Sequence, residues 1–367
     1  MRLWKWILTL VVVVIGLGSL GASCGQSVVA ILPGVINDPA NRSLRRALFS
    51  FATGELCAEM QKRSIPLKLR DADPVIGRFY PTACAVQELD NGNLFAQLLG
   101  HGYGWSNVTG RIGFEANAAI EYDHDFIMDG SRMYVYFRQQ QTQSSDLKVL
   151  MVEASGQQGG IAAVATGVLG TSIQAASQQI GERIMQHQLA RGFTVVRESD
   201  GAVSFSLGVV EQGQLPIAPF GLGESDWLVL ANERTELHQN QRDFAGPFTI
   251  TDEDEALYLT ALVEGAPAVD VVVVDKAVGD LWIHTYERQA GAPPPPSPAV
   301  FEEVIQAPMP VAGARPQLWR RMVRLRPGTY YIVLDNTATA GRTQPAGQPG
   351  DDRAALVSYA VQLGDAP

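Results

Sequence analysis

The side chains best suited to binding a ligand cluster in one short stretch, residues 100–105 (GHGYGW). His101, Tyr103 and Trp105 combine a titratable ring and two aromatic rings with a flexible glycine backbone, as many ligand-binding loops do. The alternative is an ordinary strand connection whose rings cover the core. We treat these three residues as candidate ligand-binding residues and keep both interpretations open.

A second stretch, Asp123-His124-Asp125, places three potential metal ligands side by side. Adjacent side chains of an extended chain point to opposite sides, so consecutive residues rarely share one ion. We therefore expect a solvated turn. The charged run 252–255 (DEDE) is expected to form a turn before a strand, because it lacks the glycine and spacing of a calcium loop.

The remaining polar residues form no catalytic pattern. The five histidines are scattered, and neither H-E-x-x-H nor C-x-x-C occurs. A nucleophile, base and orienting group are recognised by geometry, and sequence order alone assembles no such set. We predict no catalytic residue, no metal site and no cofactor, and we expect a protein that is not an enzyme.

The first 24 residues have the organisation of an export signal. Arg2 and Lys5 precede an uncharged apolar run at 7–20 (ILTLVVVVIGLGSL), shorter than the about 20 residues that a membrane-spanning helix needs. Small residues at 21–23 stand immediately before Cys24, where a signal peptidase excludes bulky side chains. The sequence therefore predicts a signal peptide over residues 1–23.

This segment resembles the lipobox of bacterial lipoproteins. The commonest box has leucine three positions before the cysteine, whereas Leu20 stands four before Cys24. The resemblance implies that Cys24 is lipidated, with palmitate among its acyl chains, and becomes the mature N-terminus. Gly25 in place of aspartate implies sorting to the outer membrane, on its periplasmic or surface side. An ordinary secretory signal and an uncleaved N-terminal helix are the alternatives.

Length and charge narrow the architecture and the class of partner. The chain has 367 residues, 46% of them hydrophobic, and a net charge of −10. This scattered acidic charge argues against a nucleic-acid partner, because phosphate binding requires a concentrated positive field. We expect domains at 24–215 and 224–367, joined by a linker at 216–223 that lies in an uncharged Gly- and Pro-rich stretch.

Two cysteines remain if Cys24 carries lipid. In an oxidising compartment, Cys57 and Cys84 can form one disulfide. Such a bridge stabilises a fold by roughly 3 to 4 kcal/mol in the loop-entropy model. Two free buried thiols, which behave as small hydrophobic groups, are the alternative.

The first domain is predicted to be α+β, an antiparallel sheet with a long covering helix. Hairpins are expected around three turn pairs, Asn91-Gly92, Asp129-Gly130 and Asp200-Gly201. A helix that carries Cys57 is expected between Asp38 and Ile65, because Asp38 can cap its start.

The long covering helix is expected over Gly159 to Ala190, where apolar residues recur at helical spacing. The strand at 110–122 alternates, so one face should be buried and the other largely wet. The buried set is Ile112, Phe114, Ala116, Ala118, Ile120 and Tyr122. Small residues at Ala116, Ala118 and Ala176 indicate either close helix packing or a void that accepts an apolar ligand.

The second domain is predicted to be an all-β sandwich of six to eight short strands. Its clearest strands lie at 257–263, 269–274, 281–286, 323–325, 330–334 and 357–363. Pro- and Gly-rich insertions at 290–299 and 339–352 are expected to loop out.

This part resembles the bacterial pre-peptidase C-terminal type of sandwich. The resemblance rests on 246–250 (GPFTI), the valine strand with Asp270 and Asp275, 325–331 (LRPGTYY) and the terminal Ser358-Tyr359 strand. It implies an accessory binding or stabilising module of an exported protein. No peptidase domain is recognisable ahead of it, so a link to proteolysis does not follow.

Three hypotheses about function result. The first is a non-catalytic envelope lipoprotein that binds or organises envelope proteins, a polysaccharide or an apolar ligand, with the membrane reached through its lipid. The second is a carrier that holds an apolar molecule between helix and sheet. The third is a hydrolase that combines residues 100–105 with Asp123 to Asp125.

Overall fold

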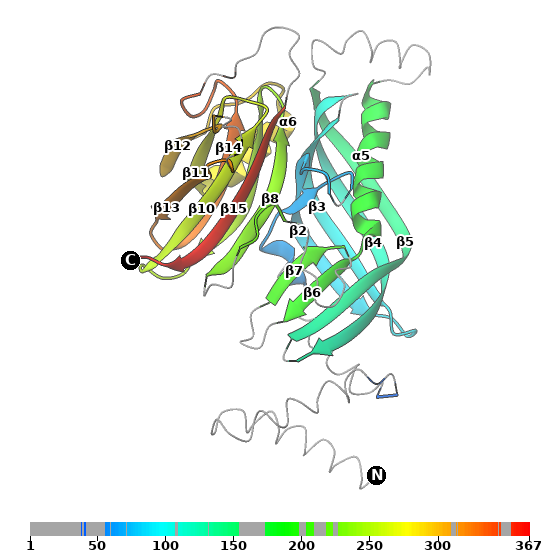
Figure 1. Ribbon diagram of the computed structural model, residues 1–367. Helices are drawn as coiled ribbons and strands as arrows, with labels where there is room; N and C mark the ends of the chain where they lie inside the picture. Colours follow the sequence, from blue (N-terminus) through cyan, green and yellow to red (C-terminus); the bar gives the residue numbers. More distant parts are fainter. Residues whose placement is uncertain are drawn as a thin grey trace, which may run out of the picture.

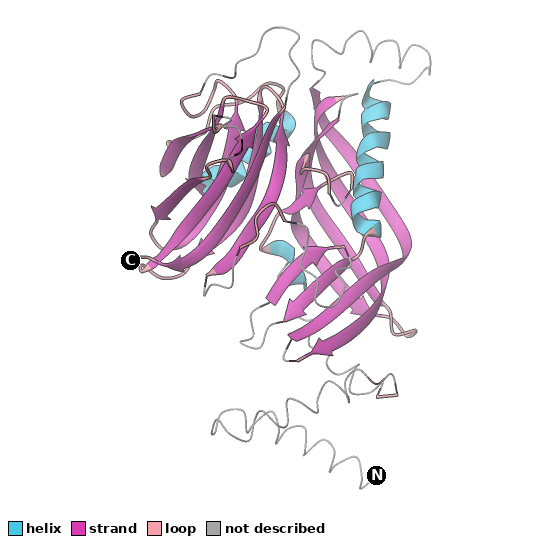
Figure 2. Cartoon of the chain, in the orientation of Figure 1, coloured by secondary structure: helices cyan, strands magenta, loops and turns pink. Residues whose placement is uncertain are grey.

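Strands dominate the computed structural model, and their pairs are antiparallel in all three sheets (Figure 2). The structure describes residues 56–106, 109–153, 173–197, 203–208, 218–222, 227–309, 315–343 and 354–367 except 59, 71 and 131, together with 38, 40, 41, 313 and 345. The predicted signal peptide and Cys24 lie outside these residues, as does most of the helix predicted from Asp38.

The first sheet contains seven strands in chain order and curves around helix α5 (Figure 1). Glycines with positive φ stand in two of its hairpin turns, Gly92 at 86° and Gly130 at 58°. The predicted hairpins are thus formed, although the turn at 200–201 lies outside the described residues. The strands are β1 (Ile65–Leu67), β2 (Gly77–Glu88), β3 (Leu94–Ser106), β4 (Gly110–Asp129), β5 (Arg132–Glu153), β6 (Phe193–Arg197) and β7 (Val203–Leu207).

The two stretches predicted to be a loop and a turn are parts of long strands. His101 lies in β3 opposite Glu115 of β4, and Asp123 lies in β4 opposite Arg138 of β5. The prediction was wrong because glycine and charged residues, although frequent in turns, also occur in strands that are paired on both sides. Pairing with neighbouring strands satisfies the backbone of both stretches and keeps them extended.

The alternation in β4 is confirmed on one face and wrong on part of the other. Its apolar side chains belong to the main core of the sheet, together with Phe79, Leu98 and Phe137. On the opposite face, Arg111 is only 2% exposed, because the sandwich covers it. The face expected to be wet therefore carries an interface.

The helix of the first domain, α5 (Ile173–Ala190), lies against β5 and β4. A Cβ at Gly181 would stand 3.0 Å from Leu147 Cδ1, so the helix packs close to the sheet at this turn. The predicted start at Gly159 and the side chain of Ala176 lie outside the described part, so the long covering helix is not shown. Among the described residues, no helix is both long and apolar enough to cross a bilayer.

The C-terminal part is a sandwich of two four-stranded sheets, in the orders β13-β10-β15-β8 and β12-β11-β14-β9 (Figure 1). Inward side chains of both sheets form its core, as the alternation predicts. The strands are β8 (Leu228–Leu237), β9 (Gln241–Ile250), β10 (Glu255–Glu264), β11 (Ala268–Asp275), β12 (Phe301–Gln306), β13 (Trp319–Arg324), β14 (Gly328–Asn336) and β15 (Ala355–Asp365).

The predicted strand at 281–286 is wrong, because these residues belong to helix α6 (Lys276–Arg288). The Asp275 side chain caps its start by accepting a hydrogen bond from Val278 N. Trp282, Ile283 and Tyr286 are each at most 1% exposed and lie at helical spacing on one face. That spacing was the signal that distinguished helix from strand.

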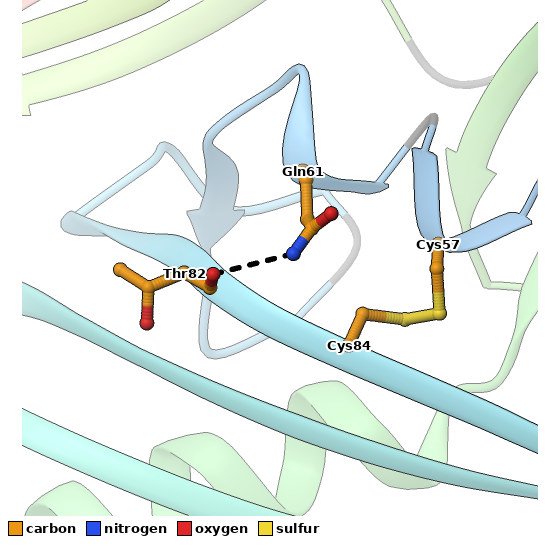
Figure 3. Close-up of a disulfide and its surroundings, with 4 residues drawn as sticks. All are labelled: Cys57, Gln61, Thr82 and Cys84. Atoms are coloured by element: carbon orange, nitrogen blue, oxygen red, sulfur yellow. Dashed lines mark hydrogen bonds between the residues drawn. A yellow bond between two sulfur atoms is a disulfide. The ribbon is translucent and has the colours of Figure 1, made fainter.

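Cys57 and Cys84 form a disulfide that ties a helical turn at 56–61 to strand β2 (Figure 3). In the same turn, Gln61 Nε2 donates to the carbonyl oxygen of Thr82 at 3.2 Å. The predicted pairing is therefore present. It attaches the segment before β1 to the sheet.

We predict that the Cys57→Ser/Cys84→Ser double variant loses about 3 to 4 kcal/mol of unfolding free energy, because its unfolded chain is no longer cross-linked. Urea denaturation of the oxidised protein and of the variant measures the difference. A loss below about 1 kcal/mol, or two reactive thiols in the non-reduced unfolded protein, would contradict the prediction.

Candidate functional site

The three candidate residues of β3 lie where the first sheet meets the sandwich. They alternate along the strand, so their side chains share one face. His101 Nδ1 is 2.7 Å from Glu287 Oε1 of α6, and Tyr103 OH donates to Asp243 Oδ1 of β9 at 3.0 Å. The Trp105 ring stacks on His238 with centroids 3.5 Å apart. We call this surface of β2, β3 and β4 against α6, β8 and β9 the junction.

A buried arginine is the hub of the junction. Arg78 of β2 forms a bidentate pair with Asp243, with Nε to Oδ1 at 2.6 Å and Nη2 to Oδ2 at 2.8 Å. Its Nη2 also contacts Glu233 Oε2 at 2.7 Å and Tyr359 OH at 2.6 Å. Burial lowers the pKa of Arg78, but Asp243 and Glu233 outweigh it and raise that pKa well above its usual value. The guanidinium is thus held charged between two carboxylates of the sandwich.

Two tyrosines of the first sheet bind the backbone of β9 beside this pair. Tyr80 OH donates to the carbonyl oxygen of Phe244 at 2.9 Å, and Tyr103 OH accepts from the Phe244 amide at 2.9 Å. Their rings belong to one buried cluster with Trp282 and Tyr286 of α6. The contact therefore combines satisfied polar groups with apolar packing.

A second buried arginine closes the C-terminal end of α6. Arg111 of β4 donates to the carbonyl oxygens of Tyr286 at 2.7 Å and Gly291 at 2.6 Å, and to Glu153 Oε2 at 2.8 Å. A cation at this end satisfies carbonyls that the helix leaves without partners. The guanidinium carbon also lies 3.7 Å from the centre of the Tyr286 ring.

The close approach of α6 to β4 depends on one glycine. A Cβ at Gly113 would stand 1.8 Å from the Glu287 carbonyl oxygen, so only glycine fits there. The Glu287 side chain is fully buried, and burial raises the pKa of its carboxyl although His101 and Arg288 act in the opposite direction. The His101 side chain is 28% exposed, so this pair joins the interior to the surface.

A third arginine, Arg242 of β9, is buried behind Tyr286. It donates to Pro293 O at 2.6 Å and to Thr337 Oγ1 at 2.8 Å. The insertion 290–299 is thus irregular, as predicted, but Pro293 packs back on α6 by accepting from Trp282 Nε1. Burial raises the pKa of nearby Asp335 to about 6, against the opposing effect of Arg242.

A small cavity of about 10 Å³ lies within the junction, lined by Tyr103, Trp105, Arg111, Arg242 and Asp243 among others. That volume corresponds to about one water molecule. A substrate cannot enter it. The buried charges here fix the first sheet to the sandwich, while only His101 and Trp105 among the three candidates reach solvent.

The structure does not bring Asp123 to Asp125 to this site. In the β3–β4 register His101 lies opposite Glu115, eight positions from Asp123, or about 26 Å along the strand. The catalytic arrangement of residues 100–105 with Asp123 to Asp125 is therefore not formed. Within the described part of the chain, no three His, Cys, Asp or Glu side chains are grouped to hold a metal ion.

Sequence reasoning missed Arg78, Arg111 and Glu287. Arg78 and Arg111 each follow a glycine near the start of a strand of largely apolar residues (GRFY and GRIGF), and a charge in such a run is a signal for a buried ion pair. Glu287 follows the segment 281–286, which the sequence predicts to be a strand, whereas in the structure both belong to α6. Its partners lie 174 to 186 positions earlier, at Gly113 and His101, and no local pattern records them.

Comparison with known proteins assigns the chain to no group. No protein family matches the sequence, and no curated protein matches it significantly. The likenesses to the lipobox and to the pre-peptidase C-terminal sandwich therefore rest on the residues quoted for them.

We predict that Arg78→Met costs about 3 to 5 kcal/mol of unfolding free energy, because the buried carboxylate of Asp243 and the half-buried one of Glu233 are left without their cation. The matched control is Arg321→Met, which breaks the exposed pair with Glu303 and should cost about 0 to 1 kcal/mol. Urea denaturation measures both. Equal losses in the two variants would contradict the assignment of Arg78 as the hub.

We predict that Gly113→Ala destabilises the protein by about 1 to 3 kcal/mol, because the new methyl group separates β4 from α6. Gly104→Ala is the control, since a Cβ at that neighbouring position meets no atom within 4 Å. Thermal unfolding should show a lower melting temperature for the first variant alone. Unchanged stability of Gly113→Ala would show that α6 does not need this close approach.

Proposed function

We propose that this protein is a non-catalytic lipoprotein of the bacterial cell envelope that acts as a binding or structural module. In this proposal, residues 1–23 are removed and the lipid on Cys24 holds the chain at the outer membrane. The domains at 24–215 and 224–367, with their linker at 216–223, then act together as one rigid body.

The observation that carries the proposal is the junction. Interfaces between domains of one chain are usually polar and permit relative motion. Here Arg78 makes charge-assisted hydrogen bonds with carboxylates of β8 and β9, and Arg111 binds the end of α6. Breaking such buried contacts costs several kcal/mol, so the two halves are expected to move as one. Such rigidity favours a scaffold or binding module, because it holds the contact residues in fixed relative positions and lowers the cost of ordering them on binding.

The described part of α5 also bears on the carrier hypothesis. We propose that α5 is the C-terminal part of a longer covering helix that begins near Gly159. A Cβ added at Gly181 would already meet the Leu147 side chain at 3.0 Å, and Ala116 and Ala118 are buried under the helix side of the sheet. These observations favour a filled layer between helix and sheet. We therefore prefer the binding module to the carrier.

The anchor can be tested in cells that carry the full chain. Labelled palmitate should be incorporated into the native protein and lost in Cys24→Ser, because only that thiol is expected to accept the lipid. Cys57→Ser/Cys84→Ser serves as the control and should keep the label. Retention of label by Cys24→Ser, or an unlabelled native protein, would refute the lipoprotein assignment.

A further inference from the structure

Positive charge is concentrated on the sheet β13-β10-β15-β8, which we call the outer sheet, although this part of the chain is acidic as a whole. Residues 222–367 contain 20 acidic and 11 basic residues, yet five of those 11 are arginines within residues 315–326, which include no acid. All five are exposed. They lie on and beside β13, an edge strand of the outer sheet.

The strand register places two of these arginines beside an aromatic residue. Met322 of β13 lies opposite Tyr258 of β10, with Arg320 and Arg324 two positions to either side. Val323 is buried in the sandwich core, so the alternate side chains of Arg320, Met322 and Arg324 project from the outer face. Neighbouring strands are about 4.8 Å apart, so these groups adjoin Tyr258.

A second aromatic ring lies flat over this position. Trp227 stacks on Tyr258 with centroids 3.9 Å apart and planes 18° apart, and it is 38% exposed. The Trp227 ring can lie across β15 because residue 364 is glycine, since a Cβ at Gly364 would meet the indole ring at 2.4 Å. We call Trp227, Tyr258, Arg320, Met322 and Arg324 the aromatic–arginine face.

The arginines of this face are available to a ligand. Arg321, which points away from the face, is paired with Glu303. Arg324 donates to the carbonyl oxygen of Pro367, which leaves other donors of its guanidinium open. Within the described part of the chain, Arg320 makes no ion pair.

We propose that the aromatic–arginine face binds an acidic polysaccharide, one whose sugar units carry carboxylates. The apolar C–H face of a sugar ring packs on a flat exposed indole, and guanidinium groups bind carboxylates through paired hydrogen bonds. This inference rests on the proposed binding function and assigns its site and its ligand class.

The distribution of charge favours a glycan over other anionic partners. A membrane surface or a nucleic-acid duplex is broad, so it also faces the rest of residues 222–367, which hold 20 acidic and six basic residues outside 315–326, and is repelled by that negative charge. A single polysaccharide strand is narrow enough to contact β13 and Trp227 alone. The aromatic–arginine face is therefore suited to a chain of sugars.

The test is binding of the full chain, purified in uncharged detergent, to polygalacturonate, alginate and hyaluronate, with neutral dextran as the reference glycan. We expect binding to at least one of these three acidic polysaccharides that weakens with added salt, and none to dextran. Trp227→Ala and Arg320→Ala/Arg324→Ala should each weaken it at least tenfold, whereas Trp227→Tyr keeps a ring and should retain most of it.

Arg342→Ala removes an exposed arginine that pairs with Glu302 on the other sheet, and it should bind as the native protein does. Melting temperatures of all variants establish that they are folded. Failure to bind any of the three acidic polysaccharides overturns the inference, as does equal binding to dextran. Binding to duplex DNA or phosphatidylglycerol vesicles that is as tight, and insensitive to Trp227→Ala, also overturns it. None of these results affects palmitate labelling at Cys24. The lipid anchor and the polysaccharide site are therefore tested independently, and either can be refuted without the other.

Discussion

The pairing of Arg78 with Asp243 and Glu233 is the interaction on which the rest of the architecture depends. Its guanidinium comes from the first sheet and both carboxylates come from the sandwich, so the charges are compensated only when the two halves are together. Arg78 and Asp243 are buried, and without each other each would carry a large desolvation cost, while Glu233 is half-buried beside them. The association of the halves is therefore part of the folded state of each.

Geometry as well as charge permits this association. The sandwich presents α6 to the first sheet, and the helix approaches both of its neighbours closely because each contact has a glycine. Gly113 admits the Glu287 carbonyl on one side, and Gly279 admits the Tyr331 ring on the other. The helix thus lies between the curved sheet and the sheet of β9, β11 and β14, and β9 and β8 also contact the first sheet directly. Larger residues at either glycine would separate the groups that Arg78 and Arg111 join.

The two sides of the sandwich consequently have different roles. The side of β9, β11 and β14 is covered by α6 and by aromatic rings of the first sheet, and its cavity has room for about one water molecule. The opposite side carries Trp227, Tyr258 and the arginines of β13, where a ligand from solvent can reach them. The candidate binding residues His101, Tyr103 and Trp105 lie at the covered side. The proposed binding site lies on the opposite side, where the sequence predicts no ligand-binding residue.

The sequence by itself determined the local structure that depends on near neighbours. The turn pairs at 91–92 and 129–130 predicted hairpins, alternation predicted the buried face of β4 and the strands β10 and β15 of the sandwich, and two cysteines predicted the disulfide. The strands β8, β9 and β12 were not among those predicted. The prediction was wrong at α6, because its short apolar run is compatible with both helical and strand periodicity. The cap formed by Asp275 distinguishes the helix. Only the tertiary structure decided what the second face of β3 and β4 touches. The partners of Arg78, His101 and Arg111 in the C-terminal part of the chain lie more than 150 positions away, and burial of these charges depends on those distant contacts, for which local sequence patterns contain no information.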